Sequence, residues 1–432
     1  MRLVWLLLAF AGTLPLQAAA QDHAEQPRIV APAAAPIDED VRFRVVGLAP
    51  KAAYELQAEL VSRAGTIWRS SAQFAADEQG VIDPAKTAPV SGSYQGIDAI
   101  GMFWSMVNTK ERQSDSSLFE SDDQSVVSFS LRQGDKTLAE HRLTLRKRAI
   151  GVSSTEIRDP VVGTLYAPYG QKNLPAVIVL GGSEGGIPRD RAALIASQGY
   201  VTLALAYFGM EPLPRELERI PLEYVDKAID WLRQQPAVNP ARVGIFGLSK
   251  GAELALLAAA RNPAVGAVIA VAPSSVSFQS IAEARSKTSS WTAGGKDVPF
   301  APYVMNDKFL QSHRLVDLYE PSLAAAPAEA EIAVERIRGP ILLLAGKDDA
   351  LWPSAAMAER LAERARRHDF GYPVKSFSFE NAGHHAGHLP LRPTAESVRL
   401  GGTAQGLAAA QVAAWRQIAE FLRANLPRDG KE

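Results

Sequence analysis

The sequence RVGIFGLSKGAELALLAAA, residues 242–260, joins a short apolar run to a run rich in alanine and leucine. The first run predicts a buried strand and the second a helix, which places Ser249 in the sharp turn between them. Gly247 and Gly251, on either side of that turn, let the strand and the helix approach without Cβ clashes. Backbone N–H groups at the start of a helix stabilise negative charge, so Ser249 is predicted to be an exposed nucleophile. The alternative is a serine that only caps the helix.

The region around this turn contains further apolar runs that do not alternate between apolar and polar residues. Such continuous runs are typical of strands buried on both faces of a parallel sheet. Amphipathic helix patterns lie between them, for example from Leu222 to Leu232 and from Trp415 to Leu422. This alternation predicts an α/β domain with an open, doubly wound, mostly parallel sheet covered by helices on both faces. The expected strands include residues 175–180, 201–206, 242–247, 264–271, 340–345 and 374–379.

The first third of the chain has a different hydrophobic pattern. Short segments alternate with a period of two residues, as in Val41–Val46 and Tyr54–Val61, and turn signals separate them. Several short strands with regular turns predict a small all-β, immunoglobulin-like sandwich. We therefore expect a β-sandwich domain at residues 37–148 and the α/β domain at residues 149–427. A polar stretch rich in alanine and proline, residues 21–36, is predicted to be a linker.

The chain starts with a predicted secretory signal peptide, residues 1–20. Arg2 is the only charge before Asp22, an apolar run from Leu3 to Leu16 follows it, and Ala18-Ala19-Ala20 offers a cleavage site between small residues. The alternative is an N-terminal membrane anchor, but a run of about 14 residues is short for a hydrocarbon core of about 30 Å. No later run of the sequence is long and apolar enough to span a membrane. The expected location is the periplasm or the extracellular space.

The composition is that of an ordinary globular protein. The 432 residues are 47% hydrophobic and 22% charged, which argues against a mainly disordered, collagen-like or coiled-coil chain. A net charge of −1 gives no basic excess for binding nucleic acid or an anionic membrane surface. The absence of cysteine excludes disulfides, thiolate metal sites and a catalytic cysteine.

A serine hydroxyl needs a base and an acid that orients the base, and in this kind of sheet they follow in the order Ser, Asp, His. Asp348 and Asp349 lie in the turn after one expected strand, and His384 and His385 follow the next strand. Loops at the carboxyl ends of parallel strands meet at one edge of a sheet. We therefore expect a triad of Ser249, Asp349 and His384. The alternatives are Asp348 as the acid, His385 as the base, and an Asp349 that only caps the following helix.

Two backbone N–H groups are expected to form an oxyanion hole. One belongs to Lys250, directly after the expected nucleophile, and the other to Ser183 in the glycine-rich loop Gly181–Gly186. Gly182 and Glu184 of the same loop are expected to line the substrate site. Glycine-rich loops can also cradle phosphates, but no P-loop Lys-Ser/Thr pair follows this one.

The clustered histidines His384, His385 and His388 could instead hold a metal ion. Because no second acidic or histidine cluster supplies further ligands and the spacing fits no zinc pattern, no metal and no redox cofactor is expected. Residues 274–307 have weak periodicity and several aromatic side chains. They predict a partial cap over the site, with a plain surface loop as the alternative.

A series of motifs runs through the chain in the same order as in a known family. They are Gly47–Pro50, Gly92–Asp98, Gly101–Ser105, Gly163–Pro168, Gly181–Gly186, Ala204–Gly209, Leu248–Leu254, Gly346–Asp349 and Ala382–His384. With these motifs the chain resembles the acyl-CoA thioesterases and bile acid-CoA:amino acid N-acyltransferases over nearly all of its length after the signal peptide. The resemblance implies an α/β-hydrolase fold, and it carries the family's Ser/Cys–Asp–His triad onto Ser249, Asp349 and His384.

Together with the signal peptide, the resemblance implies an exported serine hydrolase that cleaves a thioester or ester of a carboxylic acid through an acyl-enzyme. The amino-acid-conjugating members use cysteine, so a serine implies hydrolysis, and the expected partner is a small-molecule acyl thioester or ester. Transfer to an amine or alcohol, and a binding protein with an inert hydrolase domain, are the alternatives. One departure is HAGHLP at residues 385–390, where the family has an acidic, proline-rich stretch. It predicts a different acyl pocket.

Overall fold

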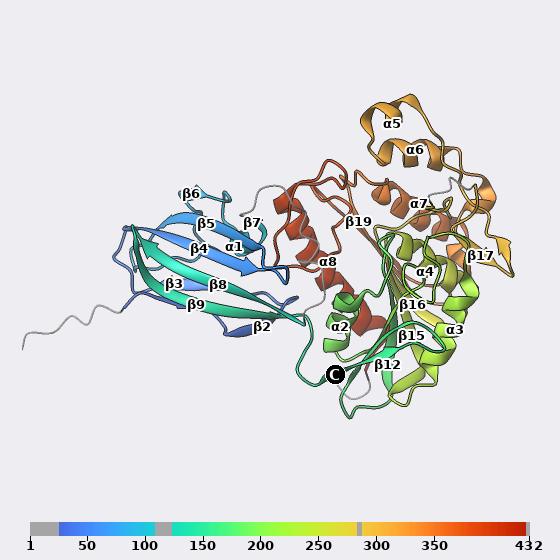
Figure 1. The fold of residues 1–432 in the computed structure, drawn as a ribbon, viewed down its shortest axis with the longest axis horizontal. Coiled ribbons are helices and arrows are strands. Elements are labelled where there is room, and N and C mark those ends of the chain that lie inside the picture. Colours follow the sequence, from blue (N-terminus) through green and yellow to red (C-terminus); the bar gives the residue numbers. More distant parts are fainter. Residues whose placement is uncertain (1–25, 109–122, 283–286, 429–432) are drawn as a thin grey trace, which may run out of the picture.

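The structure is a computed structural model and describes residues 26–108, 123–282 and 287–428. An amino-terminal β domain and a larger α/β domain lie side by side (Figure 1). The predicted signal peptide, residues 1–20, lies outside the described residues, and so do residues 21–25 of the expected linker.

An eight-stranded sheet forms the centre of the α/β domain. In spatial order its strands are β10 (Val152–Ile157), β11 (Gly163–Pro168), β13 (Val201–Leu205), β12 (Leu174–Leu180), β15 (Val238–Leu248), β16 (Val265–Val271), β19 (Ile341–Gly346) and β20 (Val374–Phe379). The pairs from β13 to β20 are parallel, and at one edge β10 pairs antiparallel with β11, as does β11 with β13. The predicted doubly wound, mostly parallel sheet is confirmed.

Helices cover both faces of this sheet, which explains the unbroken apolar runs. Every residue of β12, β13 and β19 is buried, because the side chains that alternate between the faces meet a helix on either side. One face packs against α2 (Arg189–Ser197) and α8 (Ala404–Asn425). The other packs against α3 (Leu222–Arg233), α4 (Lys250–Arg261) and α7 (Ser354–Arg367). In Figure 1, α2 and α8 lie on the side of the sheet that faces the β domain.

The β domain is built on one large sheet. Its strands, in spatial order, are β2 (Ala34–Pro36), β9 (Lys136–Arg146), β8 (Gln124–Gln133), β4 (Ala53–Val61), β5 (Ile67–Ala75) and β6 (Ser91–Gly92), and β7 (Val107–Asn108) also pairs with β5. The alternation read from the sequence holds in β4, where every second residue from Tyr54 to Leu60 is buried. Among the described residues, the second layer contains two paired strands, β1 (Arg28–Val30) and β3 (Arg44–Val46), so the predicted sandwich is markedly unequal in this part of the chain.

The prediction of a linker over residues 21–36 is wrong for its second half. β1 pairs with β3, and β2 pairs in parallel with the end of β9, more than a hundred residues later in the chain. Proline is tolerated here because β2 is the edge strand of its sheet. The apolar side chains of Ile29 and Ala35 are buried in the domain core, and the alanine- and proline-rich composition conceals this.

The two domains share one apolar core and several hydrogen bonds. The short helix α1 (Gly101–Trp104) packs against α8, and the indole of Trp104 donates a hydrogen bond to Asp98. The Trp104 carbonyl accepts a hydrogen bond of 3.1 Å from the backbone N–H of Thr394, in the segment between His384 and α8. The β domain therefore holds the chain that follows the expected catalytic histidine.

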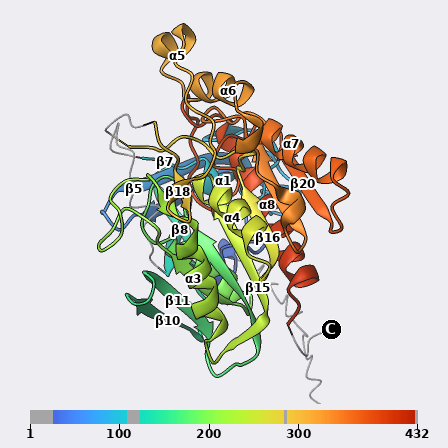
Figure 2. The ribbon, with the colours of Figure 1, turned by 90° about the vertical axis from the view of Figure 1, so that its right-hand side faces the viewer.

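The segment expected to form a cap packs elsewhere. It contains β17 (Trp291–Ala293) and β18 (Lys296–Asp297), which join β14 (Ile220–Pro221) in a small separate sheet. It is followed by α5 (Asp307–Ser312) and α6 (Val316–Ala324), which lie at the end of the domain away from β10 (Figure 2). Among the described residues, no helix has the length and apolar character needed to cross a membrane.

Candidate active site

The turn between β15 and α4 forces Ser249 into a rare backbone conformation. Its φ of 56° and ψ of −122° lie outside the regions that non-glycine residues normally occupy. The neighbours of this turn must be small: a Cβ on Gly247 would lie 2.1 Å from the carbonyl oxygen of Gly251, and a Cβ on Gly251 would lie 2.1 Å from that of Gly181. Such a strained elbow persists only when the surrounding packing holds it, and it aims the serine side chain away from the sheet.

The structure brings Ser249, His384 and Asp349 together at the carboxyl ends of β15, β20 and β19. The His384 Nε2 lies 2.9 Å from the Ser249 Oγ, and its Nδ1 lies 2.9 Å from the Asp349 Oδ2. Each of the three residues is at most 7% exposed. Ser249 lies 135 positions before His384 in the chain, and Asp349 lies 35 positions before it. The three side chains nevertheless form one continuous line of hydrogen bonds. This is the geometry in which an imidazole can take a proton from a hydroxyl.

The carboxylate of Asp349 is fully engaged. Its Oδ1 accepts from the backbone N–H groups of Leu351 and Trp352, and its Oδ2 accepts from the Ser354 hydroxyl at 2.6 Å as well as from His384. Asp348 is exposed, and no contact joins it to the histidine ring among the interactions found in the described residues. Of the two carboxylates in this turn, Asp349 is the one that contacts and orients the His384 ring.

The glycine-rich loop lies directly against the serine. A Cβ on Gly182 would be 3.2 Å from the Cβ of Ser249, so the loop backbone passes within contact distance of this serine. The Tyr207 hydroxyl shares its proton between the carbonyls of Gly181 and Gly182, at 2.8 and 3.1 Å. Burial raises the pKa of Tyr207 well above its usual value, which keeps this donor protonated. Ser183 follows this anchored pair of glycines.

The side chain of Lys250 points away from the site into the domain. Its Nζ lies 2.8 Å from both carboxylate oxygens of Glu253, and both side chains are at most 1% exposed. Glu253 also accepts from the Trp291 indole at 2.6 Å and from the backbone N–H of Phe278 at 3.0 Å. Burial lowers the pKa of Lys250, and the carboxylate of Glu253 opposes that effect. Through these two hydrogen bonds, the segment that was expected to form a cap is attached to α4, the helix that follows Ser249.

A cavity of about 760 Å³ opens onto Ser249 and His384. Its walls come from the glycine-rich loop, from the start of α2 and from the segment after His384. Glu184, expected here, lines it beside Ser183 and is exposed to solvent, whereas Gly182, also expected here, is not among the lining residues. The hairpin between β4 and β5 contributes Arg63, so the β domain forms part of the wall. Among the described residues, none of the segment 274–307 lines this cavity, which contradicts the expected cap.

His385 and His388 line the same cavity with their rings stacked, the centroids 3.9 Å apart. Burial, with smaller effects from His384 and two nearby arginines, lowers the pKa of His385 to about 3. Burial likewise holds the pKa of His388 well below its usual range. Both rings are therefore neutral at ordinary pH. In the described part of the chain, no group of three histidine, aspartate or glutamate side chains is placed to hold a metal ion.

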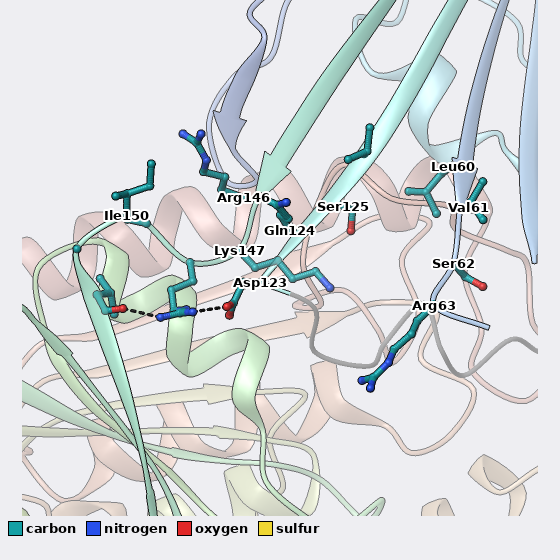
Figure 3. Close-up of a pocket in the computed structure, with 15 residues that line it drawn as sticks. Leu60, Val61, Ser62, Arg63, Asp123, Gln124, Ser125, Arg146, Lys147 and Ile150 are labelled. Carbon is teal, nitrogen blue, oxygen red and sulfur yellow. Dashed lines mark hydrogen bonds and ion pairs between the residues drawn. The ribbon is translucent and has the colours of Figure 1, made fainter. Parts of the chain in front are cut away.

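A second cavity, of about 660 Å³, lies between the β4–β5 hairpin and the start of β10 (Figure 3). Arg63, Arg146 and Lys147 line it, and Arg148 bridges Asp123 and the Val152 carbonyl at its side. Arg63 lines both this cavity and the cavity that opens onto Ser249 and His384.

Several site residues escape local sequence reasoning. Tyr207 contacts the loop from 26 positions along the chain, whereas Ser354 lies five positions after Asp349. Only their places in or beside the family's motifs mark these two residues. Glu253 has a local signal, because it lies three residues after Lys250 on the same helix face. Arg63 has no local signal, because its role depends on how the domains pack.

A strained serine elbow beside a doubly wound sheet, with a histidine and an aspartate on the following strands, defines the α/β-hydrolase class. The family described as "Acyl-CoA thioester hydrolase/BAAT N-terminal region" matches residues 38–159. The family described as "BAAT / Acyl-CoA thioester hydrolase C terminal" matches residues 220–428. The chain belongs to this acyl-CoA thioester hydrolase/BAAT family, and it is a hydrolase.

Curated relatives align along almost the whole chain. Peroxisomal succinyl-coenzyme A thioesterase of Mus musculus is 29% identical over 405 residues, which cover 90% of this chain and 94% of the relative. Acyl-coenzyme A thioesterase 3 of Mus musculus is 30% identical and covers 91% and 92%, and acyl-coenzyme A thioesterase 1 of Homo sapiens is 28% identical and covers 90% and 94%. A solved esterase of the archaeon Pyrobaculum calidifontis is 16% identical with a TM-score of 0.40, over 63% of this chain and 85% of that one.

Proposed function

We propose that this protein is an exported thioesterase that hydrolyses an acyl thioester, or a related ester, through a covalent acyl-serine. The observation that carries the proposal is the line of two 2.9 Å hydrogen bonds from Ser249 through His384 to Asp349. The family's relatives include acyl-coenzyme A thioesterases, which supports a thioester as the substrate.

In the first half of the reaction His384 Nε2 takes the proton from the Ser249 hydroxyl as its oxygen attacks the acyl carbonyl. Asp349 holds the imidazole by its Nδ1–H and stabilises the imidazolium that forms. The backbone N–H groups of Lys250 and Ser183 hold the oxyanion. The bond to the leaving sulfur or oxygen then breaks, and His384 returns its proton to the leaving group.

In the second half a water molecule replaces the leaving group. His384 takes a proton from the water, the hydroxide attacks the acyl-serine, and the free carboxylic acid leaves while Ser249 regains its proton. A serine nucleophile favours water as the acceptor, because the family's amino-acid-conjugating members use cysteine. Transfer to an amine or alcohol would divert the acyl group before water reaches it.

Export rests on the amino-terminal sequence. A single Arg2, the apolar run from Leu3 to Leu16 and the small residues Ala18–Ala20 form a signal-peptide pattern. Expression in a Gram-negative bacterium, followed by N-terminal sequencing of the periplasmic protein, tests it. A protein that begins at Gln21 supports export, and an uncleaved cytosolic chain contradicts it.

The activity is tested with purified mature protein on a panel of acyl-CoAs, N-acetylcysteamine thioesters, p-nitrophenyl esters and amides. We expect thioesters and activated esters to be cleaved, and the Ser249→Ala variant to lose about 10⁴- to 10⁶-fold in kcat. A fluorophosphonate probe should label the wild type but not the variant. Added amines or alcohols that divert the product from free acid would favour the transferase. Absence of both labelling and turnover would favour an inert binding protein.

A further inference from the structure

Trp291 is a buried side chain to which the hydrolytic steps give no role. It is the first residue of β17 and is fully enclosed in the domain. Its backbone is held on both sides, because β17 pairs in parallel with β14 and antiparallel with β18. Its indole contacts two other elements, the helix that begins with Lys250 and the tyrosine that anchors the loop of Ser183. These are the two segments whose backbone N–H groups are proposed to hold the oxyanion.

The contact with α4 is a closed set of three side chains, each at most 1% exposed. The Trp291 indole N–H donates a hydrogen bond of 2.6 Å to Glu253, and both oxygens of that carboxylate lie 2.8 Å from the Lys250 ammonium. The same ammonium lies 5.2 Å from the centroid of the indole ring, within the range of a cation–π interaction. Because the ammonium belongs to the residue directly after Ser249, these contacts fix the start of α4.

The contact with the glycine-rich loop runs through Tyr207. The rings of Trp291 and Tyr207 have centroids 5.9 Å apart and planes inclined by 50°. The Tyr207 hydroxyl donates to the carbonyl of Gly181 at 2.8 Å and lies 3.1 Å from that of Gly182. The Gly181 carbonyl also meets the start of α4, because a Cβ on Gly251 would lie only 2.1 Å from it. The loop and the helix are thus in backbone contact with each other, and both are supported by Trp291.

Stability by itself does not explain the polar character of this cluster. Burying an ion pair removes hydration from both charges, and apolar side chains of similar volume often stabilise a core equally well. The Glu253 carboxylate accepts from Lys250, from the Trp291 indole and from the backbone N–H of Phe278. Such a set of directional bonds fixes the positions of the side chains that make them. An oxyanion hole needs fixed positions, because its donors act within about 2.7 to 3.1 Å of the charged oxygen.

We propose that Trp291 is a positioning residue for the oxyanion hole, which keeps the N–H groups of Lys250 and Ser183 at the separation that the transition state requires. The inference rests on the proposed function and adds to it a residue that touches neither the substrate nor the reacting atoms. None of the described residues of the segment 274–307 lines the catalytic cavity, so Trp291 acts from inside the domain. Its loss should therefore weaken binding of the oxyanion and leave binding of the substrate almost unchanged.

Trp291→Phe tests this role, because it keeps an aromatic ring and removes the indole donor to Glu253. With an acyl thioester or a p-nitrophenyl ester we expect kcat to fall by about tenfold and KM to change by less than about twofold. Trp231→Phe is the control and should keep the wild-type kcat, since that partly buried side chain of α3 packs against the apolar core. A Trp291→Phe variant that loses stability but keeps the wild-type kcat would show that Trp291 only fills the core, and would overturn the inference.

A pair of ketone inhibitors separates oxyanion binding from substrate binding. In a trifluoromethyl ketone the Ser249 Oγ bonds to the carbonyl carbon, the hydroxyl proton passes to His384, and the carbonyl oxygen becomes an oxyanion. The methyl ketone with the same acyl chain stays uncharged and mimics bound substrate. In Trp291→Phe the Ki of the trifluoromethyl ketone should rise by about tenfold, and that of the methyl ketone should change by less than about twofold. Equal changes in the two Ki values would contradict the proposed role.

Combining Trp291→Phe with Tyr207→Phe tests whether the two residues support the same hole. If they do, the double variant should lose little more kcat than the more damaging single variant, because the second substitution removes a support that is already lost. Single losses that multiply to about 100-fold in the double variant would show that the two residues act independently. In that case Trp291 does not hold the loop and the helix together, and the inference is wrong.

A second substitution decides the matter if Trp291→Phe does not fold. 3-Benzothienylalanine, incorporated at position 291, has nearly the shape of tryptophan but lacks the N–H donor, and it should give the same selective loss. Wild-type kinetics with this residue would overturn the inference. The proposed function is judged on the wild type: if that protein neither hydrolyses esters and thioesters nor reacts with a fluorophosphonate, the proposed function and this inference both fail. An active wild type with unaffected variants ends this inference alone.

Discussion

The hydroxyl of Ser354 donates a hydrogen bond of 2.6 Å to the Oδ2 of Asp349, the same oxygen that accepts from His384. Ser354 is the first residue of α7, so the helix that follows β19 helps to fix the position of the Asp349 carboxylate. The acid of the site is thus positioned by four donors, two of them backbone N–H groups of its own turn. These contacts distinguish Asp349 from the exposed Asp348.

Asp349→Asn should lower kcat by about 10⁴-fold, because an amide at this position favours the wrong tautomer of the catalytic imidazole. Asp348→Asn, one residue earlier and exposed, should change kcat by less than about threefold. Steady-state kinetics with a p-nitrophenyl ester measures both. Equal losses in the two variants would contradict the assignment of Asp349 as the orienting acid.

Tyr207→Phe tests the anchoring of the glycine-rich loop. The substitution removes the donor shared by Gly181 and Gly182, and the loop that carries Ser183 loses its fixed position against the nucleophile. We expect kcat to fall by about tenfold with little change in KM, because the oxyanion is bound only in the transition state. Tyr224→Phe is the matched control, since that hydroxyl accepts from Val162 outside the site. A drop confined to KM would contradict this role.

Glu253→Gln should destabilise the fold by about 3 to 5 kcal/mol, because it leaves the ammonium of Lys250 buried without its counter-ion. The exposed Glu363→Gln, whose partner Arg366 is also on the surface, should cost less than about 1 kcal/mol. Denaturant unfolding measures both. The double variant Lys250→Met with Glu253→Gln should recover part of the loss. A double variant less stable than Glu253→Gln would show that the ion pair is not the cause.

Stability should fall on acidification because His385 stays neutral in the folded state. Its folded pKa of about 3 lies below the value of about 6.5 expected when unfolded, so between these values the unfolded chain binds the proton and the folded chain does not. From about pH 7 to pH 5 this costs about 2 kcal/mol of unfolding free energy. His385→Asn should remove this share of the loss, measured by guanidinium unfolding at both pH values. The idea fails if wild type and variant lose the same amount.

The serine elbow and the central sheet could be predicted from the sequence, because their signals are local. The sequence signal around Ser249, residues 242–260, spans fewer than twenty residues. Gly247 reflects a contact within that unit, whereas Gly251 lies against the backbone of Gly181. Unbroken apolar runs indicate strands buried on both faces without any knowledge of their neighbours. The order of serine, aspartate and histidine along the chain then follows from the winding of the sheet.

Other features depend on pairing between distant residues and could not be read in this way. β2 is a strand only because the end of β9 offers its backbone, and the expected cap instead ties Phe278 and Trp291 to Glu253. Asp348 and Asp349 lie side by side in one turn, and the hydrogen bonds that Asp349 accepts from His384, from Ser354 and from the turn's backbone distinguish the two carboxylates.

The sequence by itself determined the kind of chemistry this protein can carry, since residue types and local turns are properties of short segments. Only the tertiary structure determined which residues from distant parts of the chain surround the site. It brings Arg191 of α2 and Arg392, two hundred residues later, to the same histidine, and it places Arg63 of the β domain in the wall of the catalytic cavity. The burial of a side chain and the pairing of its charge depend on all the residues around it in space. Those residues become neighbours only when the chain folds.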